Sequence, residues 1–228
     1  MKFIWLGHGS MRIESGDTKL LIDPWLTGNP SLADIHHQSA VEGATHILLT
    51  HGHFDHIADV LPLAKRLSVP VVGQYDLMGF WEETEDIETI GFNKGGTVSF
   101  GDVAVTMVNA CHSSSVVVDG MPVYAGAEAG FMIAGEGKTI YFMGDTDVMA
   151  DMAIFAELHE PDIGIVPIGG HFTMDPPRAG FACRKFFDFK TIIPCHYRTF
   201  PLLAQSADDM NVPGAEIVEP QVLTPITL

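Results

Sequence analysis

The residues with the clearest chemical potential lie in the segment HGHFDH, residues 51–56. Three histidines and one aspartate stand within six positions, directly behind the apolar run ILLT. In extended backbone, side chains at i and i+2 point the same way, so His51 and His53 can face one metal ion. If the chain then bends toward a helix, Asp55 and His56 reach a neighbouring point. This spacing predicts a two-metal site, in which ions lie about 3.5–4 Å apart.

Two ligands for each metal are too few, because catalytic zinc usually has three protein ligands and one open position. Three further predicted strands each finish on a ligand-type side chain, in the segments AVTMVNACH, TIYFMGD and TIIPCH. We therefore predict that each metal has three ligands of its own and that one carboxylate joins the two metals. The first metal is assigned His51, His53 and His112, the second Asp55, His56 and His196, and Asp145 is the bridge.

The elements that must position these residues are short strands and a few helices. KFIWLGH, SMRIES, ATHILLTH and VPVVG are typical of strands, and the glycine-rich turns GD and GEGK predict two hairpins in the middle of the chain. Helical spacing follows the histidine cluster, and helices are expected over 75–84, over 147–158 and in PPRAGFACRKFFDF. This mixture favours a β sandwich flanked by helices. No linker divides the chain, so we expect one domain over residues 1–228.

The motifs, taken in order, resemble a known family. THGHFDH, the later His112, GDT at 144–146 and PCHY at 194–197 are similar to the metallo-β-lactamase superfamily, and LIDP places Asp23 where that family has an aspartate that supports the ligand loop. The resemblance implies an α+β fold, a four-layer αββα sandwich with a dinuclear site at one edge. WLGHGS, NACHSSS, PIGGHFTM and CHYRTFP resemble more closely the UPF0173 group of metal-dependent hydrolases, which is related to the ascorbate-6-phosphate lactonase-like branch.

Other residues near these motifs are candidates for a role in the site. His8 and His171 lie in glycine-flanked turns, where they can support the ligands or bind substrate. We assign catalytic roles to Asp55, which can orient the attacking water, and to His171. Ser113 follows a ligand and can line the cavity. Arg198 can pair with a phosphate or carboxylate of the substrate, or equally form a surface salt bridge.

Composition limits the partners and the compartment. The chain has 29 acidic and 12 basic residues, a net charge of −17, which disfavours nucleic acid because its binding relies on Lys and Arg. The N-terminal region lacks the pattern of a signal peptide, and no run approaches about 18–20 apolar residues. We therefore expect a cytoplasmic protein that does not enter the membrane. Cys111 and Cys195 flank ligands and are expected to be small core residues.

The predicted activity is metal-dependent hydrolysis by a hydroxide that bridges two divalent ions. The expected partner is a small-molecule substrate, an anionic ester, lactone or phosphodiester. A nuclease-type phosphodiesterase and an iron-dependent oxygenase of the same fold are the alternatives. Three imidazoles on one ion suit zinc, and the mixed nitrogen and oxygen ligands also accept manganese, nickel or iron. The sequence leaves the oligomeric state open, including a homo-oligomer.

Overall fold

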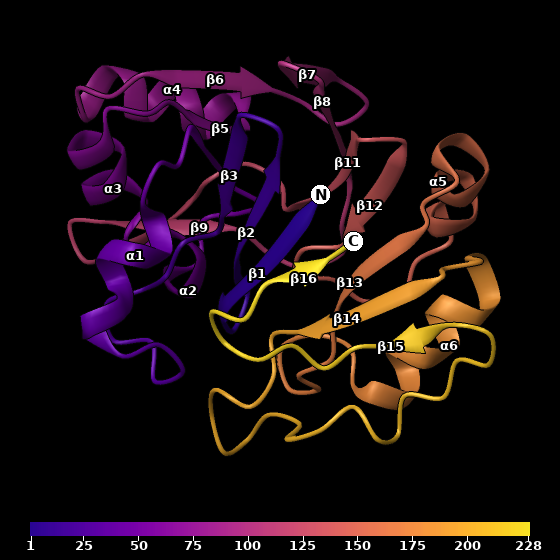
Figure 1. The fold of residues 1–228 in the computed structure, drawn as a ribbon. Coiled ribbons are helices and arrows are strands. Elements are labelled where there is room, and N and C mark those ends of the chain that lie inside the picture. The colour runs from indigo at the N-terminus through magenta and orange to yellow at the C-terminus, as the bar shows by residue number, and fades with distance from the viewer.

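The computed structural model describes residues 1–228 and contains two seven-stranded sheets that pack against each other (Figure 1). The first sheet comes mainly from the N-terminal part of the chain, and the C-terminal strand joins its edge. Its strands are, in spatial order, β16 (Ile226–Thr227), β1 (Lys2–Gly7), β2 (Ser10–Ser15), β3 (Thr18–Ile22), β4 (His46–Leu48), β5 (Val71–Gln74) and β6 (Thr89–Phe92).

The second sheet is built from the remainder of the chain, and its two predicted hairpins are confirmed. In spatial order its strands are β15 (Glu216–Ile217), β14 (Thr191–Cys195), β13 (Ile163–Pro167), β12 (Lys138–Phe142), β11 (Ala129–Gly135), β8 (Val103–Asn109) and β7 (Thr97–Phe100). A separate two-stranded hairpin consists of β9 (Ser115–Val118) and β10 (Met121–Tyr124).

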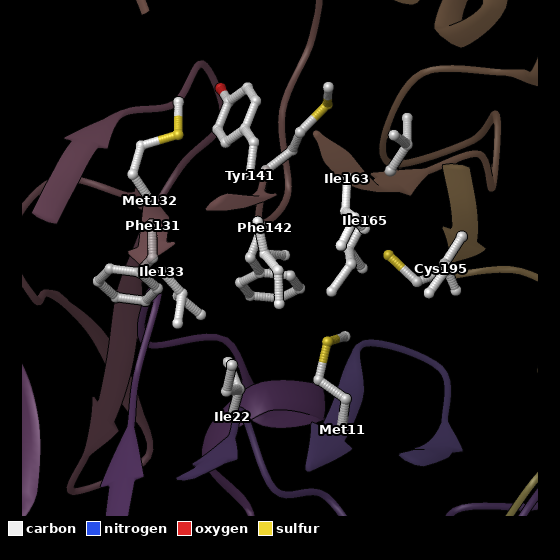
Figure 2. Packing of buried hydrophobic residues seen from close by; sticks show 14 of the residues in the cluster. Met11, Ile22, Phe131, Met132, Ile133, Tyr141, Phe142, Ile163, Ile165 and Cys195 are labelled. Carbon is white, nitrogen blue, oxygen red and sulfur yellow. The ribbon is translucent and has the colours of Figure 1, made fainter. Parts of the chain in front are cut away.

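The main core lies between the two large sheets. Figure 2 shows Met11 and Ile22 of the first sheet opposite Phe131, Ile133 and Phe142 of the second. All five side chains are fully buried. Burial of a side chain of this size stabilises the fold by about 1.5–3 kcal/mol. Both sheets are also covered on their outer faces, which explains why several strands read as continuous apolar runs instead of alternating ones.

Helices form the two outer layers. On the outer face of the second sheet, Tyr141 lies with its ring centroid 6.1 Å from that of Phe155 and 5.5 Å from that of Phe187. On the other side, a second core of 18 residues packs the first sheet against its own helices. The first sheet is covered by α1 (His37–Val41), α3 (Val60–Leu67) and α4 (Tyr75–Thr84), and the second by α5 (Asp151–His159) and α6 (Pro176–Phe186) (Figure 1).

The expected αββα sandwich is therefore confirmed, and the helix predicted over 75–84 is α4. The helix expected over 147–158 was placed too early, because α5 begins at Asp151. The Asp147 carboxylate does not cap it and instead pairs with the Arg178 guanidinium of α6. A real side-chain cap is present on α6, where Asp175 accepts a hydrogen bond from the Arg178 backbone N–H at 2.8 Å. No helix has the length and apolar character needed to span a bilayer.

Strand direction determines where the candidate ligands lie. In the first sheet β1, β3 and β4 run in one direction, because β2 is antiparallel to both of its neighbours and β3 is parallel to β4. In the second sheet β8, β12 and β14 also share a direction, because β11 is antiparallel to both β8 and β12, and β13 is parallel to both β12 and β14. The loops that leave these six strands at their carboxyl ends carry the candidate residues.

Candidate metal centre

Six strand ends and one short helix bring the candidate residues together. The first two ligands of the HGHFDH segment lie in the loop after β4, and the last two lie in α2 (Phe54–Ile57). The other residues each follow a different strand within three positions. They are His8 after β1, Asp23 after β3, His112 after β8, Asp145 after β12 and His196 after β14.

Three of these residues have left-handed backbone conformations. The φ angles are 54° for His8, 48° for Asp23 and 55° for His196. This region is unfavourable for residues with a Cβ and is concentrated at functional sites. Each of the three stands directly after its strand, so the unusual turn aims a buried polar side chain at the centre of the cluster.

A first group of ligands consists only of imidazoles. His51, His53 and His112 each present one ring nitrogen, and these three atoms lie within 4.8 Å of one another. His51 Nε2 and His53 Nδ1 are 3.0 Å apart. His51 is buried, and the other two are half-buried at the edge of a cavity. Gly52 between the first two is required by crowding, since a Cβ there would lie 2.8 Å from the Ser115 carbonyl oxygen.

A second group combines imidazoles with a carboxylate. Asp55 Oδ2 lies 3.6 Å from His196 Nε2 and 3.8 Å from His56 Nε2. His8 Nε2 joins this group at 2.9 Å from the same carboxylate oxygen. Its other nitrogen, Nδ1, is 2.8 Å from the Thr199 hydroxyl. His8 belongs to the same set of potential ligands. We interpret it as a support for Asp55, because its Nε2 forms a hydrogen bond directly with that carboxylate.

Asp145 connects the two groups. Its Oδ2 lies 3.0 Å from His196 Nε2, 3.4 Å from His56 Nε2 and 3.6 Å from His112 Nε2. One carboxylate oxygen therefore faces imidazoles of both groups. This is the geometry that the sequence-based division assigned to a bridging residue.

Asp23 and Thr50 hold two of the imidazoles from behind. The Asp23 carboxylate accepts hydrogen bonds from the Thr50 backbone N–H at 2.8 Å, from the Thr50 hydroxyl at 2.5 Å and from His56 Nδ1 at 2.8 Å. The Thr50 oxygen in turn lies 2.9 Å from His51 Nδ1. These contacts fix the tautomers of both rings and leave each Nε2 pointed at the centre, as is usual behind metal-binding histidines.

The electrostatics of the second group favour charged side chains. Burial lowers the pKa of His196, but the charge of Asp145 and the closeness of the Asp145 and Asp55 carboxylates to its Nε2 outweigh burial and raise the pKa to about 9. His56 follows the same pattern, and its pKa lies well above the usual value. Burial acts to raise the pKa values of Asp55 and Asp145, yet the facing imidazoles hold both below their usual range.

The imidazole group behaves in the opposite way. Burial, and next the charge on His56, lowers the pKa of His51 well below its ordinary value and lowers that of His53. Burial likewise lowers the pKa of His112. His8 is also held neutral, since burial and the neighbouring His196 lower its pKa to about 4. The cluster thus offers neutral nitrogen ligands on one side and carboxylates on the other.

Orphaned nitrogen atoms show that these residues fit a metal. His56 Nε2 and both ring nitrogens of His196 are buried without any hydrogen-bond partner. Leaving such a group unpaired costs about 1–3 kcal/mol, so native structures normally satisfy it. The two Nε2 atoms face Asp55 and Asp145, and a divalent cation there would satisfy both nitrogen and oxygen ligands.

The structure does not bring every predicted residue into the cluster. His171 is exposed, does not line the cavity, and contacts the ring of Phe172 with centroids 4.6 Å apart. Arg198 is ion-paired with Glu219 and lies over the Tyr197 ring, so the surface salt bridge describes it better than a substrate contact. Both assignments came from neighbouring motifs, and sequence proximity does not determine which way a loop side chain points.

Ser113 does line the cavity, and its hydroxyl lies 3.4 Å from His53 Nε2. Sequence reasoning missed Thr50, Thr199 and Glu128, whose carboxylate accepts a hydrogen bond from the His112 backbone N–H at 2.8 Å. Thr50 stands between a strand and a ligand in ILLTH, a position that could have marked it. The other two carry no such local signal. Cys111 was expected in the core but is exposed, because β8 has already ended at Asn109.

A cavity of about 860 Å³ opens onto both ligand groups. Its floor contains His53, Asp55, His112, Asp145 and His196, and nine of its 18 lining residues are hydrophobic. No lysine or arginine is among them. The arrangement can therefore hold a substrate against the ligand cluster with an apolar wall beside it.

Comparisons with known proteins agree with this site. A family model described as the beta-lactamase superfamily domain matches residues 18–197. This range includes every candidate metal ligand, and only the supporting residue His8 lies before it. The chain therefore belongs to the β-lactamase superfamily.

Relatives of high identity define the group within that superfamily. A UPF0173 metal-dependent hydrolase of Dinoroseobacter shibae is 63% identical, and one of Ruegeria sp. is 61% identical, each with 100% of both chains covered. A metallo hydrolase from the hyperthermophilic archaeon Ignicoccus hospitalis superposes with a TM-score of 0.84 at 26% identity, covering 100% of this chain and 98% of its own. The protein is a metal-dependent hydrolase.

Proposed function

We propose that this hydrolase works with two divalent cations held by the two ligand groups, with Asp145 shared between them. The observation that carries the proposal is the single Asp145 oxygen that lies 3.0–3.6 Å from imidazoles of both groups. His51, His53 and His112 would hold one cation, and Asp55, His56 and His196 the other. Zinc fits the three-imidazole group, and manganese, nickel or iron are also compatible with the mixed ligands.

Two cations held by these residues would lower the pKa of a bound water from about 15.7 toward 7 and would supply Lewis acidity for the bond that breaks. The chain supplies the orientation. All contacts of Asp55 with its three imidazole neighbours use Oδ2. Its Oδ1 is left to accept a hydrogen bond from the attacking water and to take up its proton. His8, neutral and buried, donates from Nε2 to Asp55 and keeps this carboxylate in place.

The proposed reaction is hydrolysis of a small ester, lactone or phosphodiester. The cavity reaches the ligand cluster from one side and has room for one small molecule. The sequence led us to expect an anionic substrate, but no lysine or arginine lines the cavity, so a negative charge away from the ligand cluster would have no charged partner there. A nuclease reading is weakened by the same observation, because phosphate backbones are bound through Lys and Arg.

Elemental analysis and an activity panel test the proposal. Purified protein should contain about two divalent cations per chain and hydrolyse esters, lactones or phosphodiesters in a cation-dependent way. His53→Ala should lose cation and activity together. His36→Ala is the matched control, since His36 is an exposed histidine away from the cluster. Full cation content in His53→Ala, or persulfide oxidation by an iron-loaded protein without hydrolysis, would contradict the proposal.

A further inference from the structure

Resting on the proposed hydrolysis, we infer that the substrate is uncharged and carries an apolar acyl or alkyl group several carbons long, bound along the wall of the cavity. The wall is formed by residues of separate segments that converge beside the ligands. They include Phe54 of α2, Leu61 of α3, Val117 of β9, Phe172, Phe200 and Leu202.

The exposure of these side chains is the first argument. Phe54 is 65% exposed, Val117 72%, Phe172 52% and Leu202 53%. A contiguous set of large exposed apolar side chains marks a binding surface, whereas isolated ones need no explanation. These four come from four different segments and yet line one cavity. An apolar group bound there would cover them.

Charge is the second argument. The cavity lining includes Asp55 and Asp145, which would offset half of the charge of two divalent cations, and it contains no lysine or arginine. Arg198, the candidate from the sequence, is occupied by Glu219. With a net charge of −17, the protein as a whole also repels anions. A carboxylate or phosphate on the distal part of a substrate would meet apolar side chains and no cation.

Size is the third argument. Cavities of about 300–1,000 Å³ hold drug-sized ligands, and this one measures about 860 Å³. A two-carbon acyl group at the ligand cluster would leave most of the apolar wall in contact with water. Each methylene that reaches the wall removes apolar surface from water, and full burial of one strengthens binding about fourfold.

A series of alkyl hydroxamates tests the inference without requiring turnover. Acetohydroxamate, butyrohydroxamate, hexanohydroxamate and octanohydroxamate bind the metal-loaded protein through the same head group, and calorimetry gives their affinities. We expect about a two- to fourfold gain per methylene up to six or eight carbons. The analogue of hexanohydroxamate with a terminal carboxylate should bind at least about tenfold more weakly than hexanohydroxamate itself. A flat series, equal binding of the charged analogue or no binding overturns the inference.

Two leucines give a matched pair of variants. Leu202→Ser changes an exposed leucine of the wall, and Leu158→Ser changes an exposed leucine on α5, outside the cavity. Leu202→Ser should weaken the binding of hexanohydroxamate more than that of acetohydroxamate. Leu158→Ser should bind the whole hydroxamate series with wild-type affinities. An equal loss for both ligands in Leu202→Ser, or the same loss in Leu158→Ser, contradicts the assignment of the wall.

The neutral dye Nile red separates this inference from the proposed function. In metal-free protein it should bind wild type and Leu158→Ser alike and Leu202→Ser more weakly. If the protein takes up no cation, the proposed function fails, and the dye still decides whether the wall binds apolar groups. If the protein takes up two cations but shows a flat hydroxamate series, the proposed function stands and the substrate class is wrong.

Discussion

The two ligand groups of this site differ in chemistry although they lie side by side. The imidazole group of His51, His53 and His112 has no carboxylate of its own, and its members have lowered pKa values. The mixed group pairs His56 and His196 with carboxylates that raise their pKa values. Neutral nitrogens can accept a cation directly, whereas the mixed group must first lose protons. In the proposed two-cation site, the two groups would therefore act as half-sites that bind a cation with different affinities.

Asp145 is the residue proposed to bind both cations. Replacing it by alanine removes the carboxylate oxygen that lies 3.0–3.6 Å from imidazole nitrogens of both groups. Asp145→Ala should therefore lower cation content at both half-sites and reduce hydrolysis to the level of the metal-free protein. Elemental analysis and steady-state kinetics check this. Loss of one cation only, with the other bound at wild-type affinity, would show that the half-sites are independent.

Alanine substitutions of single ligands should remove the cation from one proposed half-site at a time. His53→Ala is expected to lose about one cation equivalent from the imidazole group, and His196→Ala about one from the mixed group. A cation titration of each variant should show a single binding step, and the affinities of these steps should differ between the two variants. Indistinguishable steps would contradict the difference in chemistry proposed here.

Asp23 tests how far the support behind the ligands matters. Asp23→Asn keeps the shape but weakens the hydrogen bonds from Thr50 and His56 Nδ1. Changes of this type usually cost about 10–100-fold in metal affinity. The loss should be larger at the mixed group, which contains His56. Wild-type affinity of Asp23→Asn for both cations would contradict the role of Asp23 as a support for the ligands.

Much of this site could be predicted from the sequence, because its ligands are marked locally. The HGHFDH segment concentrates four potential ligand residues behind one strand, and three other strand-like segments of the sequence end on a histidine or aspartate. Such strand-end positions converge whenever the strands share a direction. The sandwich was likewise predictable from the alternation of strand-like runs, turn residues and helical spacing.

The remainder depends on long-range packing that no local pattern encodes. Arg198 pairs with Glu219, which is 21 positions away, and His171 turns to the surface although its motif resembles those around the ligands. The apolar wall could not be predicted either. Phe54, Phe172 and Leu202 are separated in the sequence, and only the fold shows that they line one cavity.

Filling of the mixed group should depend on pH. The raised pKa of His196, about 9, means that this imidazole is protonated at neutral pH in the metal-free protein and must release its proton to bind a cation. Affinity of this half-site should therefore rise with pH up to about 9, by about tenfold per unit for each proton released. Affinity of the imidazole group should be flat above pH 7. Calorimetry in buffers of different ionisation enthalpy measures the protons released.

The smallest effect is expected for His171. Its side chain is exposed and packs against the Phe172 ring, so His171→Ala should change the free energy of unfolding by less than about 0.5 kcal/mol. A modest rise in KM with an unchanged kcat is the expected kinetic result. A large fall in kcat would restore the catalytic role that the sequence suggested and would require the loop to move toward the ligands.

The most direct test is the position of bound cations in crystals of the metal-loaded protein, measured by anomalous diffraction at the metal edge. Two peaks about 3.5–4 Å apart are predicted, one beside the imidazole group and one beside the mixed group, with Asp145 between them. A single peak at full cation load, or two peaks without Asp145 between them, would contradict the account.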